Sequence, residues 1–154
     1  MVVTQVNGCR YCSYVHSKSA LMSGVSEQEL LKLLALQTDD FPEEEAVALT
    51  FAQHYAESGC NPDPEVEKRF GDYYGAQTSQ DIMNFIRVIT MSNLAGNTVD
   101  AFLSRLKGQP AKSSNPMSEF ILFLLFAPVT LPLMGRLGST PAPAPMHFRV
   151  TDRM

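Results

Sequence analysis

Two cysteines and a histidine near the start of the chain form its densest group of reactive side chains. Cys9 and Cys12 are three residues apart, and His16 follows four residues later. In a helix this spacing brings all three side chains to one face, where they can act on the same substrate. A helix N-terminus and a neighbouring imidazole both lower the pKa of a thiol and so favour the nucleophilic thiolate. The spacing therefore favours nucleophilic or redox chemistry.

The histidine gives the two cysteines different roles. Cys12 lies one helical turn from His16, which can take its proton, so we expect Cys12 to attack a peroxide oxygen and become a sulfenic acid. Cys9 then condenses with the sulfenic acid to a disulfide, which an external dithiol must reduce. The candidate catalytic residues are Cys9, Cys12 and His16, and this chemistry needs no cofactor.

Other uses of these residues remain open. A zinc ion would take all three as ligands and would need a fourth, which Cys60 or His54 would have to supply. Haem attachment is excluded, because it requires a histidine directly after the second cysteine and position 13 is a serine. The remaining alternative is a purely structural role, with two small buried cysteines beside a hydrogen-bonded histidine. Outside a zinc site, we expect Cys60 to be a free cysteine.

Composition and charge exclude several classes of protein. The chain has 154 residues, of which 45% are hydrophobic and 18% charged, with a formal net charge of -4. This profile is typical of a globular domain, and the lack of a basic run argues against a nucleic-acid partner. Three cysteines are too few for a disulfide framework, and the first residues lack the pattern of a signal peptide. We therefore expect a protein of the reducing cytoplasm.

Helix start and stop signals predict an all-α fold, a helical bundle. Ser26 and Glu29 form a capping box, and Asp63-Pro64 is a second helix start. Glycines close the predicted helices. The expected helices cover residues 9–23, 42–59, 63–75 and 78–108. A further expected helix begins at the Ser26–Glu29 capping box.

The C-terminal third differs from the rest in composition. Residues 120–134 carry no charge, but they are fewer than the ~20 that a membrane-spanning helix needs, and Pro128 and Pro132 interrupt them. We expect a buried or subunit-interface helix there, and a membrane is not an expected partner. The chain thus divides into a helical domain over 1–108, an apolar helical extension over 109–138 and a Pro/Ala-rich tail over 139–154.

The cysteine pair and His16 belong to a longer motif, which consists of Asn7, Gly8, Cys9, Tyr11, Cys12, His16, Ala20 and Gly24. This motif resembles that of a known family, the AhpD-like branch of the carboxymuconolactone decarboxylase superfamily. The resemblance continues less sharply to about residue 108. In the last predicted helix of that range, a polar face either lines the pocket or forms a stripe at a helix crossing, where glycine allows close approach. The polar face consists of Asn93, Gly96, Asn97 and Asp100.

The resemblance implies an AhpD-like all-helical fold, assembled as a homo-oligomer, usually a trimer or hexamer. It also implies a thiol peroxidase that reduces hydroperoxides, with Cys12 as the sulfenic acid and Cys9 as proton donor and resolving thiol. The electrons would come from a dihydrolipoamide- or thioredoxin-like dithiol partner. The alternatives are a carboxymuconolactone decarboxylase-like activity, which does not need the cysteine pair, and a non-catalytic or redox-sensing helical oligomer.

The resemblance implies one residue that is missing from its expected place. Such peroxidases carry a glutamate about twelve residues before the first cysteine, where it acts in a proton relay with the histidine. Only eight residues precede Cys9 here. We expect that an N-terminal helix with this glutamate precedes the given sequence. Otherwise another carboxylate replaces it, or the relay is absent.

Overall fold

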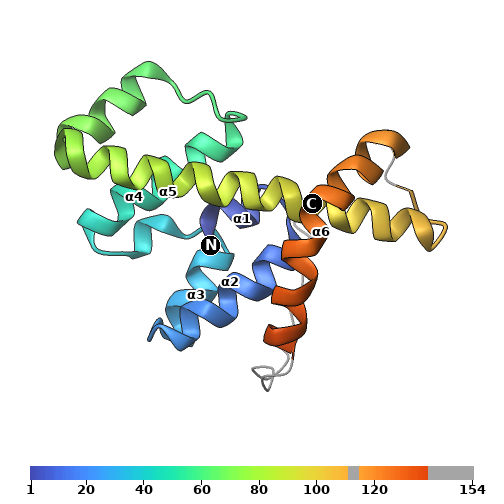
Figure 1. Ribbon diagram of the computed structural model, residues 1–154. Helices are drawn as coiled ribbons and strands as arrows, with labels where there is room; N and C mark the ends of the chain where they lie inside the picture. Colours follow the sequence, from blue (N-terminus) through green and yellow to red (C-terminus); the bar gives the residue numbers. More distant parts are fainter. Residues whose placement is uncertain (111–114, 139–154) are drawn as a thin grey trace, which may run out of the picture.

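The structure, a computed structural model, describes residues 1–110 and 115–138, and over these residues it contains helices and no strand (Figure 1). The all-α prediction is confirmed. The predicted tail 139–154 lies outside the described residues. The elements are α1 (Val2–Val6), α2 (Arg10–Met22), α3 (Glu27–Leu34), the 3-10 helix η1 (Thr38–Asp40), α4 (Glu43–Glu57), α5 (Pro64–Leu106) and α6 (Pro116–Gly138).

The helix ends follow the capping signals of the sequence. Cys9 is the N-cap of α2, and Gly24, with a φ of +95°, follows its C-terminus. The Ser26–Glu29 capping box makes both of its reciprocal hydrogen bonds at the start of α3. Asp63 caps α5 by accepting a hydrogen bond of 2.8 Å from the backbone N–H of Glu65. Local sequence thus decides where these helices begin and end.

Two features differ from the predicted helices. The short helix α1 was not expected, since five residues are too few for a periodic pattern. The predicted helices 63–75 and 78–108 are two arms of α5, which bends at Gly75, where φ is 76° and ψ is 167°. Figure 1 shows this bend in the green part of the chain. A positive φ suits glycine, and the helix resumes directly after it, so the second arm begins before the predicted start at Thr78.

The main apolar core joins α1, α4 and both arms of α5. At its centre the rings of Phe51 and Phe70 stack with their centroids 3.9 Å apart. Because Phe70 lies before the bend, this stack holds the first arm of α5 against α4. The buried members of the core are Val3, Phe51, Ala52, Tyr55, Ala56, Phe70, Met83 and Ile86.

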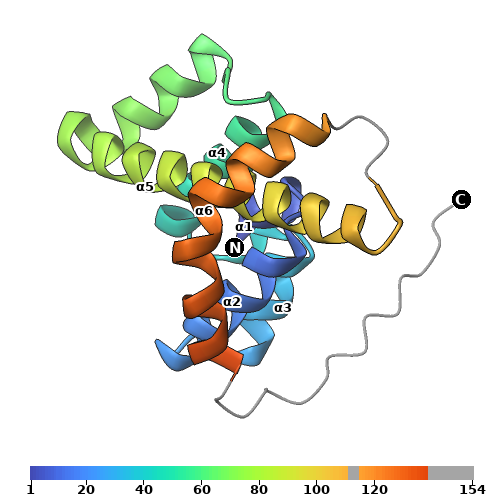
Figure 2. The same cartoon turned by 45° about the vertical axis from the view of Figure 1, so that its right-hand side comes forward.

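Helix α6, the predicted apolar extension, packs across the C-terminal part of α5 (Figures 1 and 2). Glu119 is only 3% exposed and forms a salt bridge with Arg105 of α5. The rings of Phe102 and Phe123 lie 4.5 Å apart between their centroids. No helix within residues 1–110 and 115–138 has the length and apolar content needed to cross a membrane.

Candidate active site at the start of α2

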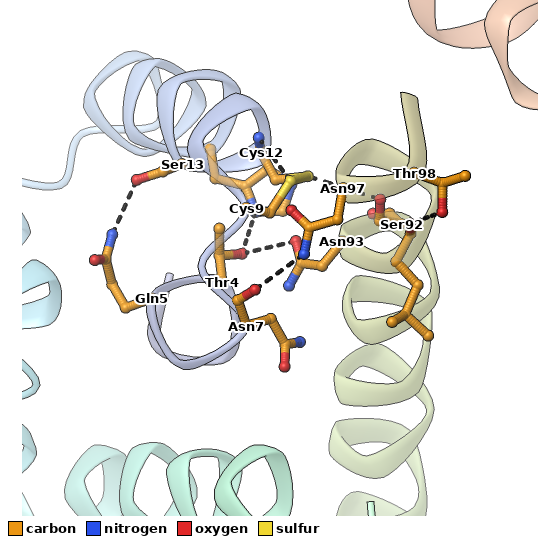
Figure 3. The surroundings of a disulfide bond; sticks show 12 residues. Thr4, Gln5, Asn7, Cys9, Cys12, Ser13, Ser92, Asn93, Asn97 and Thr98 are labelled. Carbon is orange, nitrogen blue, oxygen red and sulfur yellow. Dashed lines mark hydrogen bonds between the residues drawn. A yellow bond between two sulfur atoms is a disulfide. The ribbon is translucent and has the colours of Figure 1, made fainter. Parts of the chain in front are cut away.

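Cys9 and Cys12 are joined by a disulfide at the N-terminus of α2, with their Cα atoms 5.3 Å apart (Figure 3). The backbone N–H of Cys12 donates a hydrogen bond of 3.2 Å to Cys9 Sγ. Cys9 is 1% exposed and Cys12 9%. The helix N-terminus therefore directs an N–H group at the inner sulfur, while the outer sulfur is the one nearer to solvent.

Helix α5 forms the wall behind the disulfide. A Cβ atom added at Gly96 would lie 2.8 Å from both sulfur atoms, closer than such contacts occur. Cys12 Sγ lies 3.7 Å from the carbonyl oxygen of Ser92, which can accept the proton of a reduced thiol. The absence of a side chain at Gly96 is therefore what allows the disulfide to rest on α5.

Polar contacts tie the start of α2 to the same face of α5. Asn97 Nδ2 donates a hydrogen bond of 3.0 Å to the carbonyl oxygen of Asn7 (Figure 3). Arg10 and Asp100 form an ion pair of 2.9 Å at the surface. The structure thus places the polar face predicted from the sequence at the crossing of α5 with the cysteine segment.

His16 lies one turn after Cys12 on α2 and is half-buried. Its Nδ1 atom is 3.4 Å from the hydroxyl oxygen of Thr4 in α1, and this hydroxyl donates a hydrogen bond of 3.2 Å to Asn93 Oδ1. Burial lowers the pKa of His16. Sequence reasoning missed Thr4, because a single threonine in a five-residue helix carries no signal that relates it to a histidine elsewhere.

The residues considered as a fourth zinc ligand lie elsewhere in the fold. Cys60 follows the end of α4 as an exposed free cysteine, as predicted. His54 Nε2 accepts a hydrogen bond of 3.0 Å from the backbone N–H of Asp63 and borders a cavity of about 510 Å³ between α4 and the first arm of α5. In the part of the chain that the structure describes, no three His, Cys, Asp or Glu side chains are grouped so that they could hold a metal ion.

Residues 1–53 of the chain match the carboxymuconolactone decarboxylase family. The predicted resemblance is confirmed for this part, which contains the cysteine pair and His16 and ends within α4. No curated protein and no solved structure matches the chain.

Replacing Gly96→Ala should destabilise the oxidised protein, because the new methyl group meets both sulfur atoms. Overpacking of this kind costs about 1–3 kcal/mol, which exceeds the gain in helix propensity of up to about 1 kcal/mol. Urea unfolding measures the difference. Gly71→Ala is the matched control, since that helical glycine has nothing within 4 Å of its added Cβ. If both variants are equally stable, the disulfide does not rest on Gly96.

The lowered pKa of His16 predicts a loss of stability in mild acid. The unfolded chain takes up a proton at this residue near pH 6.5, whereas the folded protein does so only at lower pH. Unfolding is therefore increasingly favoured as the pH falls from about 6.5 through the lowered pKa. Thermal unfolding of the wild type and of His16→Gln over this range measures it, and the wild type should lose more Tm. Parallel curves would contradict the pKa shift.

Proposed function

We propose that this chain, whose residues 1–53 match the carboxymuconolactone decarboxylase family, is a thiol-dependent peroxidase of the alkylhydroperoxidase type. Its substrate is a hydroperoxide, and its catalytic residues are Cys9, Cys12 and His16. The observation that carries the proposal is the disulfide at the start of α2. A bridge between residues three apart restricts the unfolded chain less than a long-range bridge does, so a redox role explains it better than a stabilising one.

The reaction cycle has three steps. His16 takes the proton of Cys12, and the Cys12 thiolate forms a bond to the outer oxygen of the hydroperoxide, which breaks the O–O bond. The alkoxide takes the Cys9 proton and leaves as an alcohol. The Cys9 thiolate then attacks the sulfenic sulfur, the disulfide forms, and the hydroxide released takes the proton held by His16 and becomes water. A dithiol reductant finally returns two electrons by exchange and becomes a disulfide itself.

The greater exposure of Cys12 supports its role as the nucleophile. It is 9% exposed against 1% for Cys9, so a peroxide or a reducing thiol meets Cys12 first. The N–H group of Cys12 that faces Cys9 Sγ stabilises a Cys9 thiolate, which is the form required in the resolving step. The same contact also favours the opposite assignment, in which Cys9 attacks the peroxide. Trapping the sulfenic acid in variants that lack one of the two cysteines separates these assignments.

The reductant is a dithiol of the dihydrolipoamide- or thioredoxin-like class, and the cycle operates in the cytoplasm. Reducing conditions there return the pair to the dithiol form between turnovers. Lactone decarboxylation, the reaction in the name of the matched family, does not need a cysteine pair. The presence of the pair therefore favours peroxide reduction over that reaction.

Replacing Cys12→Ser should lower the rate of hydroperoxide consumption about 100-fold or more, because the nucleophile is lost. Peptide mass spectrometry of the reduced wild type, before and after one equivalent of hydroperoxide, should show the loss of two hydrogens in a Cys9–Cys12 disulfide. In Cys9→Ser, the sulfenic acid should accumulate on Cys12. Cys60→Ser is the matched control and should keep the full rate, since Cys60 is exposed and free.

Each other result assigns a different role. A sulfenic acid trapped on Cys9 in Cys12→Ser would reverse the order of the two cysteines. Formation of the disulfide without turnover in the presence of a dithiol would favour a redox sensor. Free thiols after peroxide treatment of the wild type would favour the non-catalytic alternative.

We also propose that the chain assembles as a homo-oligomer, a trimer or hexamer. One side of α5 exposes large apolar side chains that water disfavours, and α6 adds a second exposed set. The α5 residues are more than half exposed, at 67% for Phe85, 63% for Val88, 62% for Met91 and 54% for Leu94. The exposed residues on α6 are Met117, Phe120, Ile121, Leu124 and Leu125.

Replacing Met91→Glu should weaken this assembly about tenfold or more, because it places a charge in the exposed apolar face. Sedimentation velocity over a range of protein concentrations measures the association. Gln28→Glu introduces the same change of charge at an exposed position on α3 and should leave the association unchanged. A wild type that sediments as a monomer at every concentration would refute the oligomer.

A further inference from the structure

A chain of side-chain hydrogen bonds joins three helices beneath the candidate active site. It runs from His16 Nδ1 on α2 to the Thr4 hydroxyl on α1, 3.4 Å away. From there it continues to Asn93 Oδ1 on α5, 3.2 Å further, a contact that Figure 3 shows. Thr4 is 1% exposed and Asn93 0%, so water does not compete for these groups. Because an unpaired polar group is costly when buried, each of these two hydrogen bonds needs one donor and one acceptor.

The directions follow from counting protons. An amide oxygen only accepts, so the single hydroxyl proton of Thr4 goes to Asn93 Oδ1. The hydroxyl oxygen then has only its lone pairs to offer to His16, and Nδ1 must supply the proton for that contact. A neutral imidazole carries one N–H group. If that group is at Nδ1, the lone pair is at Nε2.

We propose that Thr4 and Asn93 are positioning residues that hold neutral His16 in its Nδ1–H tautomer and so make Nε2 the atom that accepts the Cys12 proton. The catalytic part of this inference, the transfer of the Cys12 proton to Nε2, rests on the proposed function. The assignment of the tautomer does not depend on that function. Nε2 has no hydrogen-bond partner among the residues that the structure describes, so it is available to a thiol.

The surroundings of His16 agree with a neutral ring. Burial disfavours its cationic form and lowers its pKa. Within the described residues, the Nδ1 atom of the ring contacts the Thr4 hydroxyl. A hydroxyl backed by an amide selects the tautomer as a carboxylate would, but it adds no negative charge that would stabilise the imidazolium.

The tautomer can be measured directly in the oxidised full-length protein. Long-range 1H–15N correlation spectra, with His16 assigned by its loss in His16→Gln, distinguish a protonated ring nitrogen from an unprotonated one. Above the pKa of His16, the wild type should show a protonated Nδ1 and an unprotonated Nε2. The opposite pattern in the wild type would overturn the proposal without any variant at Thr4.

Variants at Thr4 then test the cause. Thr4→Val removes the hydroxyl at nearly constant shape and should shift His16 toward a mixture of tautomers, whereas Thr4→Ser should restore the wild-type spectrum. Thr90→Val is the matched control, since Thr90 is also buried and its hydroxyl donates to its own helix at Ile86. An unchanged His16 spectrum in folded Thr4→Val would overturn the proposal.

Alkylation of Cys12 in the reduced protein tests the catalytic consequence. Loss of one hydrogen bond that selects the basic tautomer should slow alkylation at neutral pH about two- to tenfold in Thr4→Val, with recovery in Thr4→Ser. Equal rates in all variants would overturn the role of Nε2 as the acceptor. If the wild type shows the expected tautomer and rates but consumes no peroxide, the proposed function fails and the positioning of His16 stands.

Discussion

The close approach of α5 to the start of α2 is the constraint on which the candidate site depends. The disulfide sulfurs occupy the space that any side chain at position 96 would need. With Gly96 in place, α5 comes near enough for its polar face to reach Asn7 and Arg10. The cysteine pair is therefore enclosed by the part of α5 around Gly96, more than eighty residues later in the chain, which buries Cys9 and leaves Cys12 nearer the surface.

The same crossing is unusually polar for a buried contact. Thr4 and Asn93 are almost wholly buried, and the side-chain amide nitrogens of Asn7 and Asn93 are buried without a hydrogen-bond partner among the described residues. A buried polar group without a partner costs about 1–3 kcal/mol, so this crossing contributes little net stability. The stacked core of Phe51 and Phe70 lies apart from it and carries much of the apolar burial. Stability and chemistry are thus placed in different parts of the fold.

Helix α5 has a buried side and an exposed apolar side. Toward α1, α2 and α4, helix α5 presents its buried face, while its opposite side exposes a row of large apolar residues. Helix α6 covers the C-terminal end of that helix, anchored by the buried carboxylate of Glu119. A single chain leaves the rest of this apolar side open to water, which is the physical reason for proposing a homo-oligomer.

The sequence alone determined the local features of this protein. Capping residues set the ends of α2 and α3, glycine marked the bend in α5, and the spacing of Cys9 and Cys12 brought the two cysteines together at the start of α2, because these effects act over three or four residues. Only the tertiary structure decided which residues surround the cysteine pair. Thr4 meets Asn93 across 89 residues, and Asn97 meets Asn7 across 90. No periodicity links positions so far apart, since their contact depends on how whole helices pack.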